Sequence, residues 1–235
     1  MIYNNVLEAV GNTPMIRLNR MTDEDSAEIL VKFEALNVGG SVKTRTAWNM
    51  ILDAEKQGKI QKDTIIVEPT SGNQGIGLAL VGAVRGYHTV IIMPDSVSEE
   101  RRKLVQNYGA EVKLVHDEGD IGECIQRCIR TALEIKEADS RVYVPQQFEN
   151  MANYEAHLNM TGREIVEQVG GRIDGFCSGI GTGGTISGVG EALRKANPEI
   201  TIWAIEPEHA AILSGGEVGS HLQMGIGDGV IPEIL

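Results

Sequence analysis

Lys43 stands at a position that packing alone explains poorly. It follows two glycines and a serine in "NVGGSVKTRTA", residues 37–47, where a helix is expected to begin. The first turn of a helix carries partial positive charge and favours Asp or Glu over a cation. An amine that is neutral, or bound in an imine, suits this position better than a protonated one. Lys43 is therefore a candidate for covalent chemistry with an aldehyde.

A glycine-rich turn later in the chain could hold an anion. Residues 179–188 read "GIGTGGTISG" and lie between an apolar run and a helical pattern. Glycines let the backbone approach an anion closely, and the helix that follows directs free N–H groups at it. Thr182 and Thr185 add hydroxyl donors, so a phosphate is the expected ligand. A plain tight turn is the simpler alternative, and the density of glycine disfavours it.

The same turn allows a second ligand. Gly179, Gly181 and Gly184 fit the pattern G-x-G-x-x-G, and Glu206 follows at the end of the next expected strand. In dinucleotide-binding proteins a carboxylate at about this spacing binds a ribose. The motif by itself is weak evidence, and the turn alone leaves both ligands open.

Two further turns carry polar side chains. "PTSGNQG", residues 69–75, offers hydroxyl groups, an amide and the N–H groups of a helix start. These groups suit a carboxylate or the phenolic oxygen of a cofactor, although an ordinary Ser or Asn helix cap explains them equally well. "PQQFEN", residues 145–150, places Gln146 and Gln147 after another apolar run. Taken alone, that segment is better explained as a capped turn with Phe148 in the core.

Short apolar runs and longer helical patterns alternate along the chain and would position these turns. Strands are predicted at 28–34, 64–70, 88–94, 111–115, 141–145, 172–180 and 201–207. Helices are predicted near 43–58, 74–86, 98–108, 119–138, 151–169 and 184–196. Several strands are rich in Val and Ile with little alternation, as expected where both faces are covered. The order indicates a doubly wound, mostly parallel α/β protein.

Ligands bind such sheets at the carboxyl ends of the strands, which is where the three turns lie. A lysine, a phosphate cradle and a carboxylate site are the minimum that pyridoxal phosphate and an amino-acid substrate require. Lys43 would form a Schiff base with the cofactor's aldehyde. The turn at 179–188 would hold the phosphate, and the turn at 69–75 would hold the substrate carboxylate.

Composition narrows the class of protein. The chain has 235 residues, 42% of them hydrophobic, and a net charge of −12. Nucleic acid and anionic membrane surfaces are therefore unfavourable partners. The first residues lack the layout of a signal peptide. No apolar stretch approaches the roughly 20 residues that span a bilayer, so the expectation is a soluble cytoplasmic protein.

The cysteines and two of the histidines are assigned to packing. Cys124 and Cys128 lie four residues apart in a helical pattern, and Cys177 lies in an apolar strand. Three sparse cysteines form no disulfide framework, and no cluster completes a metal site, so no metal is predicted. His157 and His221 have no evident carboxylate or serine partner in the sequence. Both are predicted to be structural or at the rim of a site.

The motifs resemble the cysteine synthase (O-acetylserine sulfhydrylase) and cystathionine β-synthase family of fold-type II pyridoxal-phosphate enzymes. Matching segments occur in family order over nearly the whole chain. They are "GNTPMIRL" (11–18), "NVGGSVKTR", "EPTSGNQGIGLA", "VPQQFEN", "GIGTGGTISG", "IEPEHAAILSGG" and "GIGDGVIP" (225–232). The resemblance implies a fold like that of the tryptophan synthase β chain. It outweighs the dinucleotide interpretation, which explains one turn only.

The resemblance also implies residue roles. Lys43 would carry the Schiff base and move protons, and Asn73 would hydrogen-bond the phenolic oxygen of the cofactor. The residues implied to bind the phosphate are Gly181, Thr182, Gly183, Gly184 and Thr185. The residues implied to hold the substrate carboxylate are Thr70, Ser71, Gly72, Asn73 and Gln146.

The implied reaction is β-replacement on an activated serine such as O-acetylserine, with sulfide or a small thiol as the nucleophile. The product would be cysteine or a related amino acid, and the enzyme would be a homodimer. Two alternatives remain open: β-elimination or replacement with another nucleophile, and an inactive cofactor-binding remnant that acts through a protein partner. The sequence does not identify the leaving group.

The resemblance divides the chain into two α/β domains. Residues 39–147 would form a smaller domain that closes over the substrate, and 1–38 with 148–235 would form the larger, cofactor-binding one. Family members usually read "NPGGSVKDR" and "SGNTG", whereas Val38, Thr44 and Gln74 occupy the differing positions here. Relatives continue beyond the position of Leu235. The chain is therefore predicted to be a C-terminally incomplete form of the fold, less stable or more self-associating than a longer relative.

Overall fold

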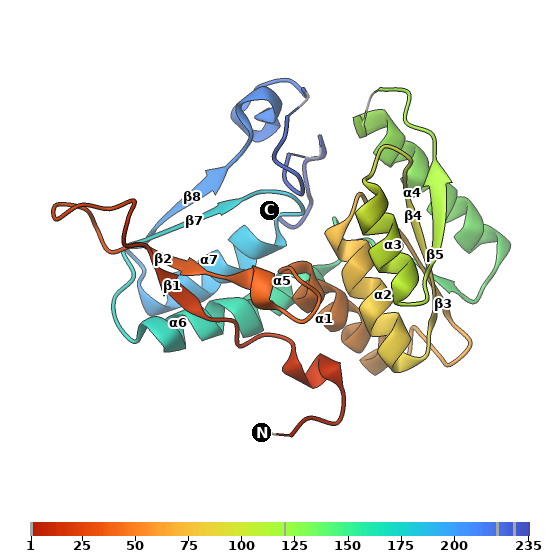
Figure 1. The fold of residues 1–235 in the computed structure, drawn as a ribbon, viewed down its shortest axis with the longest axis horizontal. Helices are drawn as coiled ribbons and strands as arrows, with labels where there is room; N and C mark the ends of the chain where they lie inside the picture. The colour runs from red at the N-terminus through yellow and green to blue at the C-terminus, as the bar shows by residue number, and fades with distance from the viewer. Residues whose placement is uncertain (1, 120, 220, 228) are drawn as a thin grey trace.

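The main sheet has four parallel strands in the order β5-β4-β3-β6 (Figure 1). The computed structural model describes residues 2–119, 121–219, 221–227 and 229–235. The strands are β3 (Ile65–Pro69), β4 (His88–Pro94), β5 (Glu111–Val115) and β6 (Val142–Tyr143). The two central strands, β3 and β4, are largely buried, which explains their continuous apolar sequence.

Helices cover both faces of this sheet. On one face, α1 (Lys43–Lys56), α2 (Asn73–Arg85) and α3 (Glu99–Asn107) pack in one apolar cluster with Ile66 and Ile91. On the other face, α4 (Ile121–Ala138) packs Cys124 and Cys128 against Val67 and Ile92. Successive residues of β3 thus point to opposite faces, as the pleat requires.

A second group of helices lies beside the first (Figure 1). One helical run comprises α5 (Met151–Ala156), the π-helical η3 (His157–Gly162) and α6 (Arg163–Val169). It packs against α7 (Gly184–Ala196) so closely that a Cβ at Gly188 would collide with the carbonyl oxygen of Tyr154. The parallel pair β7 (Gly175–Gly179) and β8 (Thr201–Ile205) flanks α7.

The N-terminal segment forms a small antiparallel pair, β1 (Met15–Arg17) and β2 (Leu30–Lys32). Short 3-10 helices complete the described elements: η1 (Val6–Ala9), η2 (Glu34–Leu36), η4 (Glu208–Ala210) and η5 (Ile212–Ser214). Because η2 leads directly into the 37–42 turn, the β1–β2 pair fixes the path of the chain into α1.

The predicted α/β class is confirmed, with some differences in detail. The sequence predicted no strand at Met15–Arg17, because three residues, two of them exposed, give no measurable periodicity. The predicted strands at 28–34 and 172–180 are shorter in the structure, and the predicted helix at 151–169 contains a π-helical segment. π-Helical turns occur frequently at functional sites, and this one passes beneath the glycine-rich turn.

Candidate active site

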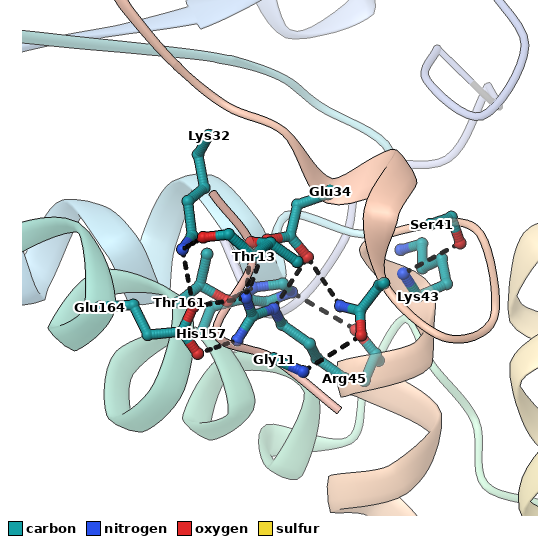
Figure 2. Close-up of polar contacts among 12 residues, drawn as sticks. Gly11, Thr13, Lys32, Glu34, Ser41, Lys43, Arg45, His157, Thr161 and Glu164 are labelled. Atoms are coloured by element: carbon teal, nitrogen blue, oxygen red, sulfur yellow. Dashed lines mark hydrogen bonds and ion pairs between the residues drawn. The ribbon is translucent and has the colours of Figure 1, made fainter. Parts of the chain in front are cut away.

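Lys43 is the first residue of α1, and its side chain reaches across to the glycine-rich turn. Its Nζ donates a hydrogen bond to Thr182 Oγ1 over 3.1 Å. Close helix packing places it there: a Cβ at Gly77 on α2 would lie 2.9 Å from the Lys43 carbonyl oxygen. The Lys43 N–H donates to Ser41 Oγ over 3.3 Å, as Figure 2 shows. The amine therefore meets the turn that the sequence predicted as a phosphate cradle.

The cradle is built at the start of α7. Gly183 precedes the helix with φ 81°, a left-handed conformation that glycine adopts without steric cost. Lys43, Gly181, Thr182, Gly183 and Thr185 together line one cavity of about 1020 Å³. Gly184, the remaining predicted phosphate residue, packs instead against Asn153, where a Cβ would collide with the amide. The start of α7 and two threonines therefore line the same space as Lys43.

Asn153 on α5 supports the cradle, although no motif in the sequence marks it as a site residue. Its Nδ2 donates to Thr182 Oγ1 and to the Gln147 carbonyl oxygen, each over 2.8 Å. Its Oδ1 lies 3.4 Å from the Thr46 hydroxyl. Asn153 is fully buried, so these contacts fix the Thr182 hydroxyl from below.

His157 was predicted to be structural or at a rim, and it lies in the core beneath the cradle. Its Nε2 lies 3.2 Å from Thr185 Oγ1 and 3.3 Å from Thr46 Oγ1, while its Nδ1 lies 3.0 Å from Thr161 Oγ1. Burial, aided by the positive charges of Lys43 and Arg45, lowers the pKa of the His157 imidazole to about 3. The ring is therefore neutral at physiological pH and hydrogen-bonds hydroxyls on three helices.

The low pKa of His157 leads to a stability prediction. Below pH 6.5 an unfolded chain takes up a proton at this histidine, whereas the folded protein does not, so the contribution to stability falls as pH falls. Between about pH 6.5 and 5 the loss amounts to about 2 kcal/mol. We expect urea unfolding to show this slope in the difference between the natural protein and His157→Gln. A difference that is independent of pH over this range would contradict the neutral, buried imidazole.

The 69–75 turn lies at the carboxyl end of β3. The Thr70 hydroxyl is buried and accepts the Gly72 N–H over 3.2 Å, and Asn73 is the exposed first residue of α2. Ser71 lies next to Arg101 on α3, whose guanidinium is 3.5 Å from the Ser71 carbonyl oxygen. These residues do not line the cavity of Lys43. Thr70 to Asn73 therefore form a separate polar edge.

Gln146 belongs to the same edge, because β6 pairs with β3. It adopts φ 59°, which is unusual for a residue with a side chain, and its Nε2 donates to Glu149 Oε2 over 2.9 Å. Below the turn, the buried carboxylate of Glu68 accepts the N–H groups of Gln146 and Gln147 over 3.0 and 3.1 Å. Glu68 was not predicted as a site residue, since a glutamate at the end of an apolar run gives no sign of which backbone it will bind.

Other predictions concern groups away from the cradle. Cys124 and Cys128 are buried, and Cys177 is exposed. Within the described residues, no group of three or more His, Cys, Asp or Glu side chains could hold a metal ion. No helix in that same part of the chain is long and apolar enough to cross a membrane. Glu206, the candidate ribose ligand, accepts hydrogen bonds from the backbone of Leu213 and Ser214, so its carboxylate stabilises η5.

The residues around the cavity fit pyridoxal phosphate. A phosphate requires several donors directed at one point, and the start of α7 with the Thr182 and Thr185 hydroxyls supplies them. An aldehyde requires an amine, and Lys43 reaches that same cavity. The dinucleotide interpretation lacks its carboxylate, because Glu206 is already hydrogen-bonded.

Comparison with known proteins agrees with this fit. A family model described as "Pyridoxal-phosphate dependent enzyme" matches residues 6–235. The chain belongs to this family. A cysteine synthase of Staphylococcus aureus (strain Mu50) is 48% identical over 233 residues, which are 99% of this chain and 74% of that relative. The cofactor of the protein is therefore pyridoxal phosphate, as predicted.

Solved structures of the family share the fold. The cysteine synthase of Entamoeba histolytica superposes with a TM-score of 0.93 at 38% identity, covering all of this chain and 70% of that one. A hydrogen sulfide-producing enzyme of Fusobacterium nucleatum gives a TM-score of 0.91 at 41% identity, covering 99% and 77%. Both the family resemblance and the fold-type II architecture predicted from the sequence are confirmed.

Proposed function

We propose that the protein catalyses β-replacement on O-acetylserine with sulfide as the nucleophile, forming cysteine. The observation that carries the proposal is the contact between Lys43 and Thr182, which brings an amine to a glycine-rich anion cradle in one cavity. Cysteine synthases at up to 48% identity are among the relatives of the chain and narrow the reaction within the family.

In this proposal the cradle and Lys43 hold the cofactor. Gly181, Thr182, Gly183, Gly184 and Thr185 would bind its phosphate, Asn73 would donate to its phenolic oxygen, and Lys43 would bind its aldehyde. When bound, pyridoxal phosphate supplies an aldehyde for the amine of the substrate and an electron sink for the pair left at the α-carbon. The chain's own groups then have two tasks, orientation of the substrate and proton transfer.

Lys43 would perform the proton transfers. Once released by the substrate amine, its Nζ would remove the α-proton, the acetate would leave from the β-carbon, and Nζ would return a proton after sulfide has added. The substrate carboxylate would be held by hydroxyl, amide and N–H donors at the carboxyl edge of β3 and β6. These donors are supplied by Thr70, Ser71, Gly72, Asn73 and Gln146.

The two predicted domains give this edge a way to approach the cradle. We propose that residues 39–147 move as a unit over the substrate and exclude water. The four-stranded sheet lies wholly within that range, whereas β7, β8 and α7 belong to residues 148–235. We also propose a homodimer in the cytoplasm, where three unpaired cysteines stay reduced.

The alternative reaction is β-elimination, or β-replacement with another nucleophile. Gln74, which replaces the usual threonine of the family motif, is buried next to the edge, and its Oε1 has no hydrogen-bond partner in the described structure. Thr44 is buried with an unpartnered hydroxyl in the same way. One relative is described as a hydrogen sulfide-producing enzyme.

The deciding experiment supplies the purified protein and pyridoxal phosphate with O-acetylserine or serine, with and without sulfide. Cysteine that appears only with sulfide supports the proposal. Pyruvate and ammonia in equal yield with or without sulfide would replace it with β-elimination. No turnover of either substrate by a protein that binds the cofactor would favour a non-catalytic role.

A further inference from the structure

We propose that Glu68 is a positioning residue for the amino-acid substrate. Its carboxylate holds the 145–150 turn, and with it the Gln146 side chain, in the conformation that receives the substrate carboxylate. The inference rests on the function proposed above, because it assumes that Gln146 binds substrate. Glu68 itself need touch neither substrate nor cofactor.

The carboxylate forms a two-point clamp on the turn. Oε2 of Glu68 accepts the Gln146 N–H over 3.0 Å, and Oε1 accepts the Gln147 N–H over 3.1 Å. Glu68 is completely buried at the end of β3, and the turn follows β6, its neighbour in the sheet. Two N–H groups that converge on a buried point need an acceptor with two oxygens. A carboxylate therefore matches this backbone better than any other side chain.

The clamp holds a residue whose backbone conformation is unfavourable. Gln146 has φ 59°, a left-handed conformation that residues with a Cβ rarely adopt. Such a conformation persists only where surrounding contacts determine it, and it recurs at ligand-binding sites. The Gln146 carbonyl oxygen also accepts the Glu149 and Asn150 N–H groups, over 3.1 and 3.0 Å. Without Glu68, the Gln146 N–H would lose its acceptor, and one of the contacts that hold this conformation would be gone.

The clamp also reaches the cradle. The Gln147 carbonyl oxygen accepts Asn153 Nδ2 over 2.8 Å, and Asn153 donates in turn to Thr182 Oγ1. Thr182 Oγ1 also accepts a hydrogen bond from Lys43 Nζ. One chain of hydrogen bonds thus runs from Glu68 through the turn to the residues proposed to hold the cofactor. Asn153 therefore connects the 145–150 turn to the cradle within the core.

The clamp needs the ionised carboxylate, because a protonated oxygen is a poor acceptor. Burial raises the pKa of Glu68 to about 7, although the two N–H donors and the charge of Lys43 lower it. Tyr143 on β6 also interacts with Glu68: burial raises the pKa of its phenol, and the negative charge of Glu68 raises it further. The turn is therefore held above about pH 7 and loosens as pH falls through this value.

The test compares Glu68→Gln and Glu68→Asp with the natural holoenzyme, and Glu111→Gln on exposed β5 serves as the matched control. An amide places a donor against one N–H, which leaves that N–H unsatisfied. We expect hydrogen exchange of the 145–150 amides to quicken at least about tenfold in Glu68→Gln. The Kd for L-serine and the KM for O-acetylserine should rise by a similar factor, with a smaller change in kcat. Glu68→Asp keeps the charge, so its exchange rates, Kd and KM should lie between those of Glu68→Gln and the natural protein. Glu111→Gln should match the natural protein in all three.

One readout needs no variant and no turnover. In the natural holoenzyme, the amide proton shifts of Gln146 and Gln147 should titrate together near pH 7, and L-serine binding should weaken as pH falls through that range. Amide shifts that stay flat over the whole pH range in which the protein is folded, or unchanged exchange in a folded Glu68→Gln protein, would overturn the role of Glu68 even if cysteine is formed. Titrating amides in a protein that forms no cysteine would retain the clamp and reject the reaction.

Discussion

Replacing Lys43 with alanine should lower kcat for cysteine formation by at least about 10³-fold, since one amine is proposed both to bind the cofactor and to move the α-proton. The cofactor should no longer be fixed to the chain by borohydride, whereas in the natural protein the added mass should map to the peptide that contains Lys43. The measurements are steady-state turnover and mass spectrometry of the reduced, digested protein.

The fold should survive this change. Thr182 keeps its hydrogen bond from Asn153, and the start of α1 remains packed against Gly77. Lys56→Ala is the matched control, because Lys56 is exposed at the other end of the same helix. It should leave turnover and labelling unchanged. Turnover of Lys43→Ala within tenfold of the natural protein, or cofactor fixed to another lysine, would remove Lys43 from the mechanism.

The sequence was sufficient to predict the parts of the site that act through local geometry. A lysine at a helix start and a glycine-rich strand-to-helix turn are short patterns whose chemistry is readable within ten residues. The packing of α1 beside the segment that contains the turn then brings the two together, since they belong to different sheets. Lys43 and Thr182, which are 139 residues apart, meet through those two elements.

The supporting residues could not be predicted, because their partners are distant in sequence and ordinary in type. Glu68 binds backbone N–H groups 78 and 79 residues away, and a backbone partner leaves no trace in residue identity. Asn153 lies in the helix predicted near 151–169, and none of the sequence motifs includes it. The short strand β1 was not predicted, for a related reason. Its pairing with β2 is decided by tertiary contacts rather than by its own three residues.

Arg45 is the clearest case of a side chain whose role only the structure reveals. It is fully buried, two residues after Lys43, and Figure 2 shows it between two carboxylates. Its guanidinium donates to both oxygens of Glu34 over 2.8 and 2.9 Å, and to both oxygens of Glu164 over 2.5 and 2.7 Å. Lys32 also donates to Glu164, over 2.7 Å. Two cations and two anions thus join β2, η2, α1 and α6 in a neutral cluster.

The cluster links the N-terminal segment to the beginning of α1. Burial by itself would raise the pKa of Glu164, but hydrogen bonds from Arg45 and Lys32 lower it to about 2, so this carboxylate depends on its two cations. Gly11 completes the enclosure: a Cβ there would lie 2.8 Å from Glu164 Oε1 and 2.9 Å from the Arg45 guanidinium. If this cluster loosened, the 37–42 turn that positions Lys43 would lose its support.

Arg45→Met should therefore destabilise the protein by about 3–5 kcal/mol, because it keeps the side-chain length but leaves a largely enclosed carboxylate uncompensated. Urea unfolding followed by circular dichroism measures the loss. The pair of the exposed Arg85 with Glu55, 2.7 Å apart, provides the control, and Arg85→Met should cost less than about 1 kcal/mol. Equal costs for the two substitutions would show that the cluster contributes no more than a surface ion pair.

A double variant separates loss of charge balance from loss of packing. Adding Glu34→Gln to Arg45→Met removes the anion that Arg45 neutralised, while Lys32 still balances Glu164. Charge balance returns, so the double variant should be more stable than Arg45→Met alone. If packing were the whole cause, Glu34→Gln would add its own cost, and the double variant would be the less stable of the two. The sign of that difference decides whether electrostatics or packing holds the start of α1 in place.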